Sequence, residues 1–157
     1  MSEFEIIKNH FSRDYDRSDI NVGVGDDGAI LNIDQMIGSQ LVVSTDTIVE
    51  QTHFPEGTIA GNIAKRAMCI NLSDMAGMGA LPLWFTLSLT LPGDKANEAW
   101  LSEFSSGLFE IASEYNCALI GGDTTKGPLS VTICIFGNIP SDAGLKRSSA
   151  SIGDLIY

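Results

Sequence analysis

LPLWFTLSLTLP, residues 81–92, decides the fold class, because its side chains alternate strictly along the chain. Alternation with a period of two is typical of a β-strand that buries one face. One face of the predicted strand carries Phe85, Leu87, Leu89 and Leu91, and the other carries Trp84, Thr86, Ser88 and Thr90. The first face predicts a sheet covered by other elements. The second is small, uncharged and, at Trp84, too apolar to favour contact with water, so it indicates either a partner surface or coverage by the chain's own helices.

Helices and further strands are predicted on both sides of this strand. Residues 3–11, 59–79 and 98–115 have helical patterns, with Asn97 as the N-cap of the last helix and the second helix buried on most sides. Strands are predicted at 29–33, 40–50 and 129–139, at 117–122 running into a turn, and at the final DLIY. We therefore expect an α+β fold, a mixed and largely antiparallel sheet with helices packed on one face.

Composition narrows the possible partners and the compartment. The chain has 157 residues and a formal net charge of −11, which suits one domain and makes nucleic acid and anionic membranes poor partners. No apolar stretch is long enough to span a membrane, and the N-terminus does not resemble a secretory signal. The three cysteines, Cys69, Cys117 and Cys134, lie in apolar segments, so we expect buried, reduced thiols in a cytoplasmic protein.

GVGDDG, residues 23–28, matches the glycine pattern G-x-G-x-x-G but does not fit its usual context. A dinucleotide-binding loop follows a strand, opens a helix and has no acid at the pyrophosphate. Here a polar stretch comes before the loop, AILNI follows it, and the loop contains Asp26 and Asp27. The chain also lacks a G-x-x-x-x-G-K-[ST] loop, so any phosphate must be bound in another way.

Acids recur where the sequence predicts burial or a turn. Asp27 follows the glycine turn, Asp46 interrupts an apolar strand, Asp74 lies in the second helix and Asp123 ends an apolar strand. Each of them alone could be a turn, capping or backbone-bonded residue. Together they favour a site for divalent cations, because the chain has only nine Lys and Arg and Mg²⁺ prefers carboxylates and phosphate oxygens. Asp26 remains a turn residue or a residue that supports the site.

Several motifs, in order and at matching spacing, resemble the thiamine-monophosphate kinase family. They are GVGDDGAIL (23–31), VVSTDTIVEQTHF (42–54), AMCINLSDMAGMGALP (67–82), LSLTLP (87–92), LIGGDTTKGPLSVTI (119–133) and LKRSSASIGDLIY (145–157). That family is part of the ATP-binding superfamily of aminoimidazole ribonucleotide synthetase and selenophosphate synthetase. The resemblance implies phosphorylation of thiamine monophosphate to thiamine diphosphate, with ATP as co-substrate and several Mg²⁺ ions.

The resemblance also implies site residues, position by position. The implied metal ligands are Asp27, Ser44, Thr45, Asp46, Asp74 and Asp123. The implied ATP contacts are Gly122, Asp123 and Arg147, and the implied substrate contact is His53. Ser44 and Asp46 share one strand face, so Thr45 would bind through its carbonyl unless the strand is irregular there. Without the resemblance, His53 would be a turn or packing residue and Arg147 a solvated cation. EQTHF, residues 50–54, replaces the family's usual glycine-containing turn before the histidine.

The resemblance does not assign a general base, and the sequence offers no obvious one. It implies a homodimer through the sheet, and a second α/β domain that we expect to be absent from residues 1–157, so that this chain alone is inactive or nearly so. Two other hypotheses remain open. One is a non-catalytic nucleotide-binding or dimerisation module, and the other is a related enzyme of the superfamily that uses a different acceptor.

Overall fold

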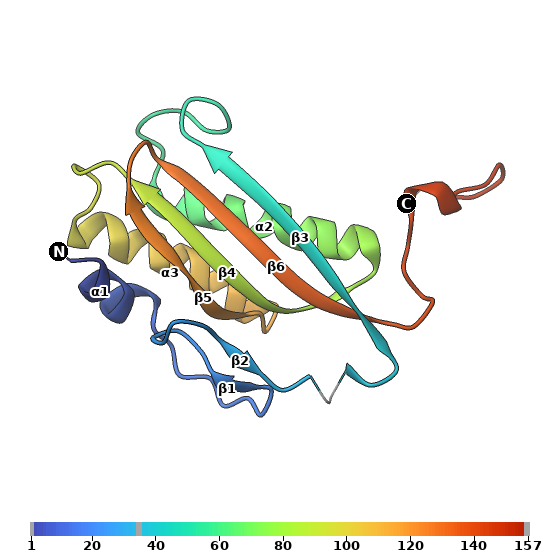
Figure 1. The fold of residues 1–157 in the computed structure, drawn as a ribbon. Helices are drawn as coiled ribbons and strands as arrows, with labels where there is room; N and C mark the ends of the chain where they lie inside the picture. Colours follow the sequence, from blue (N-terminus) through green and yellow to red (C-terminus); the bar gives the residue numbers. More distant parts are fainter. Residues whose placement is uncertain (1, 34–35, 156–157) are drawn as a thin grey trace.

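A four-stranded sheet forms the centre of the molecule (Figure 1). The computed structural model describes residues 2–33 and 36–155. The strands are β3 (Ser39–Val49), β4 (Leu81–Leu91), β5 (Ala118–Lys126) and β6 (Ser130–Pro140), in the order β3-β6-β4-β5. Only the β4–β5 pair is parallel. β3 and β5 are therefore the two edges of the sheet, and this arrangement determines where the residues of the candidate site lie.

Two helices cover one face of the sheet, α2 (Ala60–Met78) and α3 (Glu98–Glu114) (Figure 1). Phe85, Leu87, Leu89 and Leu91 of β4 are buried in the core on this face. The Asn97 side chain accepts a hydrogen bond from the backbone N–H of Trp100 at 3.0 Å, which confirms the predicted N-cap of α3. The predicted α+β class, with a largely antiparallel sheet and helices on one face, is confirmed.

The N-terminal segment differs from the sequence-based prediction. The helix expected over 3–11 is one α-helical turn, α1 (Glu3–Ile6), followed by a π-helical turn, η1 (Ile7–Phe11). The strand expected over 29–33 is only β2 (Ile30–Leu31), and it pairs with β1 (Ile20–Val22), a strand that the sequence did not indicate. Two-residue and three-residue strands are too short for alternation to reveal them.

Trp84, on the face of β4 that suggested a partner surface, is buried within the chain itself. Only 2% of its surface is accessible, because Tyr15, Ile20, Leu31 and Met36 pack against it on the sheet face opposite the helices. The chain therefore covers this part of the second face of β4 with its own N-terminal segment. Neither α2 nor α3 takes part in this covering.

A buried ion pair fixes the N-terminal segment to the sheet. The Arg17 guanidinium donates to both carboxylate oxygens of Asp19, at 2.9 and 2.5 Å, and to the backbone carbonyls of Leu83 and Asn116. The Trp84 indole N–H donates to Asp19 at 2.9 Å. The hydrogen bonds from Arg17 lower the pKa of Asp19, against the opposing effect of burial. The Asp19 carboxylate is therefore bound by Arg17 and Trp84, and it takes no part in the candidate site.

Helices α2 and α3 cross where each has a glycine. A Cβ atom added at Gly107 of α3 would lie 2.4 Å from the carbonyl oxygen of Gly61 in α2. Gly107→Ala is therefore expected to lower the free energy of unfolding by about 1–3 kcal/mol, although alanine favours helices. Urea denaturation measures this.

The control for this substitution is Gly77→Ala in α2, where nothing lies within 4 Å of an added Cβ. That variant is expected to keep its stability or gain up to about 1 kcal/mol. Equal effects of the two substitutions would show that the close approach of the helices does not matter.

The cysteines and the C-terminal residues agree only in part with the predictions made from the sequence. Cys117 is buried as predicted, and burial raises the pKa of its thiol to about 12. Cys134 is half-buried, and Cys69 is exposed, contrary to our prediction, because it lies on the solvent side of α2. Asp154 and Leu155 form no strand, and the rest of DLIY lies outside the described residues. Within residues 2–33 and 36–155, no helix is long and apolar enough to cross a membrane.

Candidate functional site

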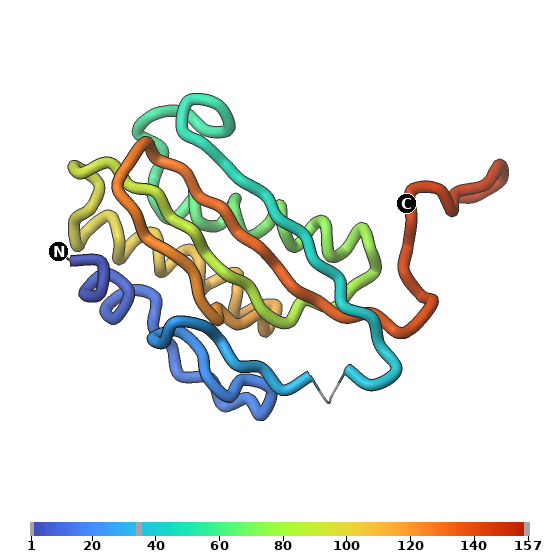
Figure 2. Tube along the Cα trace, in the orientation of Figure 1, coloured from blue at the N-terminus to red at the C-terminus, as the bar shows by residue number. Residues whose placement is uncertain are grey.

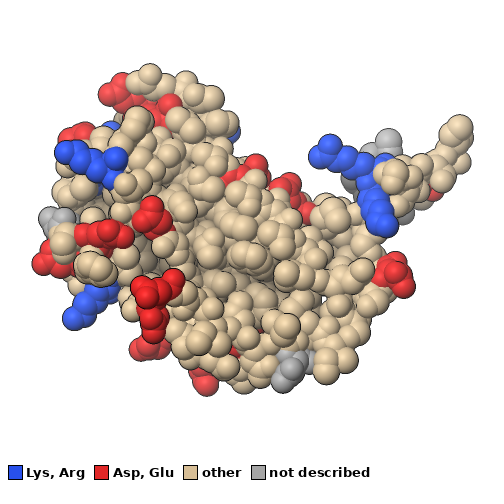
Figure 3. Space-filling view, viewed as in Figure 1, with Lys and Arg blue, Asp and Glu red and all other residues tan. Residues whose placement is uncertain are grey.

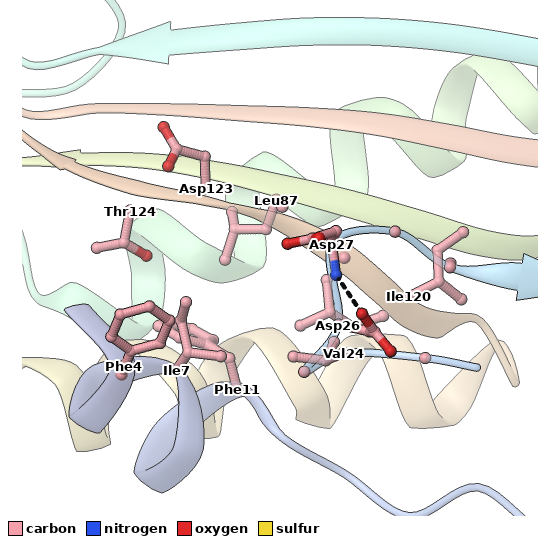
Figure 4. Close-up of a pocket in the computed structure, with 17 residues that line it drawn as sticks. Phe4, Ile7, Phe11, Val24, Asp26, Asp27, Leu87, Ile120, Asp123 and Thr124 are labelled. Carbon is pink, nitrogen blue, oxygen red and sulfur yellow. Dashed lines mark hydrogen bonds between the residues drawn. The ribbon is translucent and has the colours of Figure 1, made fainter.

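The glycine loop, residues 23–28, places its two aspartates in different directions. Gly25 has a φ of 125°, a backbone conformation that residues other than glycine rarely adopt. The backbone N–H of Asp27 donates to the Asp26 carboxylate at 2.8 Å, so Asp26 stabilises the turn itself. The Asp27 carboxylate points to the side of the loop on which Asp123 lies, and the Asp26 carboxylate points away from it (Figure 4). The glycines therefore present Asp27, and Asp26 supports the loop.

Asp123 lies within strand β5, and the turn expected before it is wrong. β5 continues to Lys126 because it pairs with β4 along its whole second half. Gly122 makes this pairing possible: its φ is 152°, and an added Cβ would lie 1.8 Å from the carbonyl oxygen of Leu87. A glycine is thus required just before Asp123, and the close approach of the two strands fixes the position of Asp123 along β5.

Asp27 and Asp123 line the same pocket (Figure 4). The cavity has a volume of about 290 Å³ and lies between the N-terminal helix, the glycine loop and the β5 edge. Its lining residues are Phe4, Ile7, Phe11, residues 23–29, Leu87 and residues 119–124. Three of these residues are aspartates and none is Lys, Arg or His, so phosphate could bind here through backbone amides, the Thr124 hydroxyl or a bound cation.

A second polar group lies at the opposite edge of the sheet, between β3 and α2. The Ser44 hydroxyl donates to the Asp74 carboxylate at 2.5 Å. Ser44 and Asp46 are half-buried while Thr45 between them is exposed, as expected from alternation along a strand. The predicted burial of Asp74 is wrong, because its side of α2 is open to solvent beyond β3, the edge strand.

The structure brings the implied metal ligands together only in part. Asp27 lies with Asp123, and Ser44 lies with Asp74, but β3 and β5 are opposite edges of the sheet. Among the residues that the structure describes, no three His, Cys, Asp or Glu side chains are grouped to hold a metal ion. Within residues 2–33 and 36–155, the carboxylates therefore lie in small groups at the two edges of the sheet.

His53 lies in the exposed loop after β3. Its Nδ1 accepts a hydrogen bond from the backbone N–H of Val49 at 3.0 Å, so the proton of the neutral ring is on Nε2. The adjacent Phe54 is buried and anchors the loop, and Gln51 in this loop has a positive φ of 65°. The His53 ring is therefore oriented by this bond, its Nε2–H has no partner among the described residues, and it does not line the pocket of Asp27 and Asp123.

Arg147 lies apart from the other implied ATP contacts. It begins a short 3₁₀ helix, Arg147–Ser149, on a C-terminal segment that extends away from the sheet (Figure 2). Lys and Arg side chains are visible on this segment in the space-filling view (Figure 3). The segment is attached where the backbone N–H of Leu145 donates to the Met78 carbonyl at 3.1 Å. Gly122 and Asp123 line the pocket, and Arg147 does not.

The family model for AIR synthase related protein, N-terminal domain, matches residues 25–139. This chain belongs to the AIR synthase related family. The match begins at the glycine loop and includes Asp27, Asp46, Asp74 and Asp123, the four acids that the sequence analysis selected.

Within the AIR synthase related family, the chain is similar to thiamine-monophosphate kinases. It is 47% identical to that of Salmonella typhimurium over 99% of this chain and 47% of the relative. The crystal structure of the Stenotrophomonas maltophilia K279a enzyme matches with a TM-score of 0.81 and 44% identity, over 88% of this chain and 43% of that one. A structure described as AaThiL complexed with AMPPCP and TMP matches with a TM-score of 0.63 and 27% identity, over 66% and 33%. The chain spans about half the length of the curated relatives it matches.

Sequence reasoning missed the apolar side of the pocket. Residues 3–11 were predicted only to form a helix, and no role in a site was assigned to Phe4, Ile7 or Phe11. The structure leaves Phe4 81% exposed at the pocket. An exposed aromatic side chain cannot be told from a buried one by spacing alone.

Proposed function

We propose that this chain is the nucleotide-binding and metal-binding N-terminal domain of a thiamine-monophosphate kinase. The observation that supports this most is the pocket of Asp27 and Asp123, formed by two of the motifs that the chain shares with those kinases. The structural relative described with AMPPCP, an ATP analogue, and TMP supports the same pair of ligands. The additional length of the relatives would supply the remaining contacts, as a second domain.

The residues of the pocket fit Mg²⁺ as a partner of phosphate. Magnesium is usually held by one or two carboxylates, with waters and substrate phosphates completing its coordination. Asp27 and Asp123 provide two carboxylates beside a turn of backbone amides, and no cationic side chain competes with a metal ion in the pocket lining. We propose that these two residues hold Mg²⁺, with Ser44, Thr45, Asp46 and Asp74 as a further group at the β3 edge. Bound Mg²⁺ would neutralise charge on the donor and acceptor phosphates.

The proposed reaction transfers the γ-phosphoryl group of ATP to a phosphate oxygen of thiamine monophosphate. A new P–O bond forms at the acceptor, the bond between the β- and γ-phosphates breaks, and ADP leaves. A phosphate monoester has a second pKa of about 6, so the acceptor oxygen is already largely ionised at pH 7 and needs no general base. His53 would donate its Nε2–H to the substrate. Arg147 would bind ATP phosphates once its segment approaches the pocket.

Consumption of ATP by a protein that carries this chain tests the proposal. We expect ADP to form only when Mg²⁺ and thiamine monophosphate are both present, with thiamine diphosphate in equal amount. ADP formation with another phosphate ester, and not with thiamine monophosphate, would instead identify a related enzyme of the superfamily. Mg-dependent ATP binding without turnover on any acceptor would favour the non-catalytic module.

We also propose a homodimer formed through the sheet. The face opposite the helices has an apolar groove lined by Leu31, Ile33, Met36, Ile37, Ser39, Leu41, Trp84, Ile120 and Phe136. Leu41 and Val43, on the edge strand β3, are 53% and 52% exposed, which is unfavourable in water. Sedimentation velocity should therefore give the mass of a dimer, and a monomer at all concentrations would contradict this.

The three free thiols support a reducing, cytoplasmic compartment.

A further inference from the structure

The pocket of Asp27 and Asp123 has two chemically different sides. The acidic side consists of the glycine loop and residues 122–124, and it suits a phosphate held through a cation. The other side consists of Phe4, Ile7 and Phe11, and it has no polar side chain (Figure 4). A phosphate against that apolar wall would lose hydration without gaining a partner. The wall therefore calls for a different chemical group on the same ligand.

Phe4 is the part of this wall that a ligand can reach. It is 81% exposed, whereas Phe11 is buried and Ile7 is half-buried. The ring of Phe4 lies at the pocket, beside Ile7 and across from Thr124 (Figure 4). It offers a flat apolar surface on the side opposite the glycine loop.

The π-helical turn that carries Ile7 and Phe11 packs against α3, although the helix before it is short. The π-helical turn is closed by the N–H of Ser12, which donates to the carbonyl of Ile7 at 2.9 Å. In this turn His10 is buried, and its Nε2 lies 3.2 Å from the carboxylate of Glu98 at the start of α3. Phe11 packs edge-to-face on Phe104 of α3, with ring centroids 6.3 Å apart. π-helical turns are frequent at functional sites, and these contacts hold the turn of Ile7 and Phe11 against α3.

We propose that Phe4 and Ile7 bind the planar heteroaromatic ring of a phosphate ester whose phosphate lies at Asp27 and Asp123. The inference rests on the proposed kinase function, since both co-substrates have this chemistry: ATP carries an adenine ring and thiamine monophosphate carries a thiazolium and a pyrimidine ring. The cavity, at about 290 Å³, is near the lower end of the range for small-molecule sites and accepts one such ring system, not both ligands. Phe4 is thus a binding residue for one co-substrate.

Binding by this chain tests the inference, with three probes measured by calorimetry in the presence of Mg²⁺. The probes are AMPPCP, thiamine monophosphate and inorganic tripolyphosphate, which has phosphates and no ring. Phe4→Ala is expected to lower the affinity for one of the two ring-bearing ligands about tenfold and to leave the affinity for tripolyphosphate within about twofold of the wild-type value. Phe4→Tyr, which keeps the aromatic face, should restore the affinity. The ligand that is weakened identifies which co-substrate uses the wall.

The matched control is Tyr115→Ala, which removes another exposed aromatic side chain, one that does not line the pocket. It should leave all three affinities unchanged. If Phe4→Ala binds both ring-bearing ligands as the wild type does, the inference is wrong and the kinase proposal stands. If Phe4→Ala weakens the binding of tripolyphosphate by the same factor, Phe4 affects affinity only by supporting the glycine loop, and the inference is also wrong. A wild-type chain that binds neither ring-bearing ligand would overturn the inference and the proposed nucleotide site together.

Discussion

Asp123→Asn is expected to weaken Mg-dependent binding of AMPPCP to this chain on the order of 100-fold, which is the scale of losses when metal sites are altered. The substitution keeps the shape of the side chain and removes the charge that attracts Mg²⁺. Asp123 is exposed on β5 and no hydrogen bond holds its carboxylate in the described structure, so the fold should be retained. Calorimetry with and without EDTA measures the affinity, and circular dichroism checks the fold.

Asp26→Asn is the matched control, because Asp26 lines the same pocket but turns its carboxylate away from Asp123 (Figure 4). Asparagine retains an oxygen that can accept the N–H of Asp27, so the loop should persist. We expect a change of less than about threefold, well below the loss of charge at a metal ligand. Equal losses in the two variants would mean that the pocket responds only to its total charge.

Asp19→Ala is expected to lower the free energy of unfolding at pH 7 by about 3–5 kcal/mol, the usual cost of removing one partner of a buried ion pair. Without Asp19, the Arg17 guanidinium loses its counter-charge and the Trp84 indole N–H loses its acceptor. Together these bonds attach the N-terminal segment, which carries Arg17, to Trp84 of the sheet. Urea denaturation followed by tryptophan fluorescence should show the change directly.

The stability difference between wild type and Asp19→Ala should depend on pH. Because the folded-state pKa of Asp19 is lowered, its contribution is complete above the ordinary Asp value of about 4 and is lost as the pH falls through the folded-state pKa. The difference between the two proteins should therefore narrow below about pH 4. The control is Glu110→Ala, which breaks an exposed ion pair with Lys65 and should cost less than about 1 kcal/mol. A constant difference from pH 7 to pH 3 would contradict this account.

The long elements were predictable because their patterns are local. Strict alternation in residues 81–92 revealed β4 and its core face, and Asn97 marked the start of α3. The N-terminal hairpin was missed, because β1 and β2 are too short for a period to appear. The hydrogen bonds of the Arg17–Asp19–Trp84 cluster to the sheet and to Asn116 join residues 65 to 99 positions apart, and no local pattern encodes such contacts.

The site was predictable in its residue types and only partly in its arrangement. Carboxylates in apolar surroundings pointed to cations, and Asp27 and Asp123 do line one pocket. Their separation from Asp46 and Asp74 follows from the strand order β3-β6-β4-β5, which alternation does not specify. The expected turn before Asp123 failed for a related reason. Gly122 looked like a turn residue, but here it allows close approach to Leu87 within a continuing strand.

The position of a bound divalent ion tests the central proposal most directly. Mn²⁺ can replace Mg²⁺ and broadens the NMR signals of nearby amides, so a spectrum of this chain with AMPPCP and substoichiometric Mn²⁺ locates the ion. We expect the strongest broadening at residues 25–28 and 121–124, on the two sides of the pocket, and its loss in Asp123→Asn. Broadening confined to other acidic surfaces, with these two segments unaffected, would contradict the proposal that Asp27 and Asp123 hold the metal.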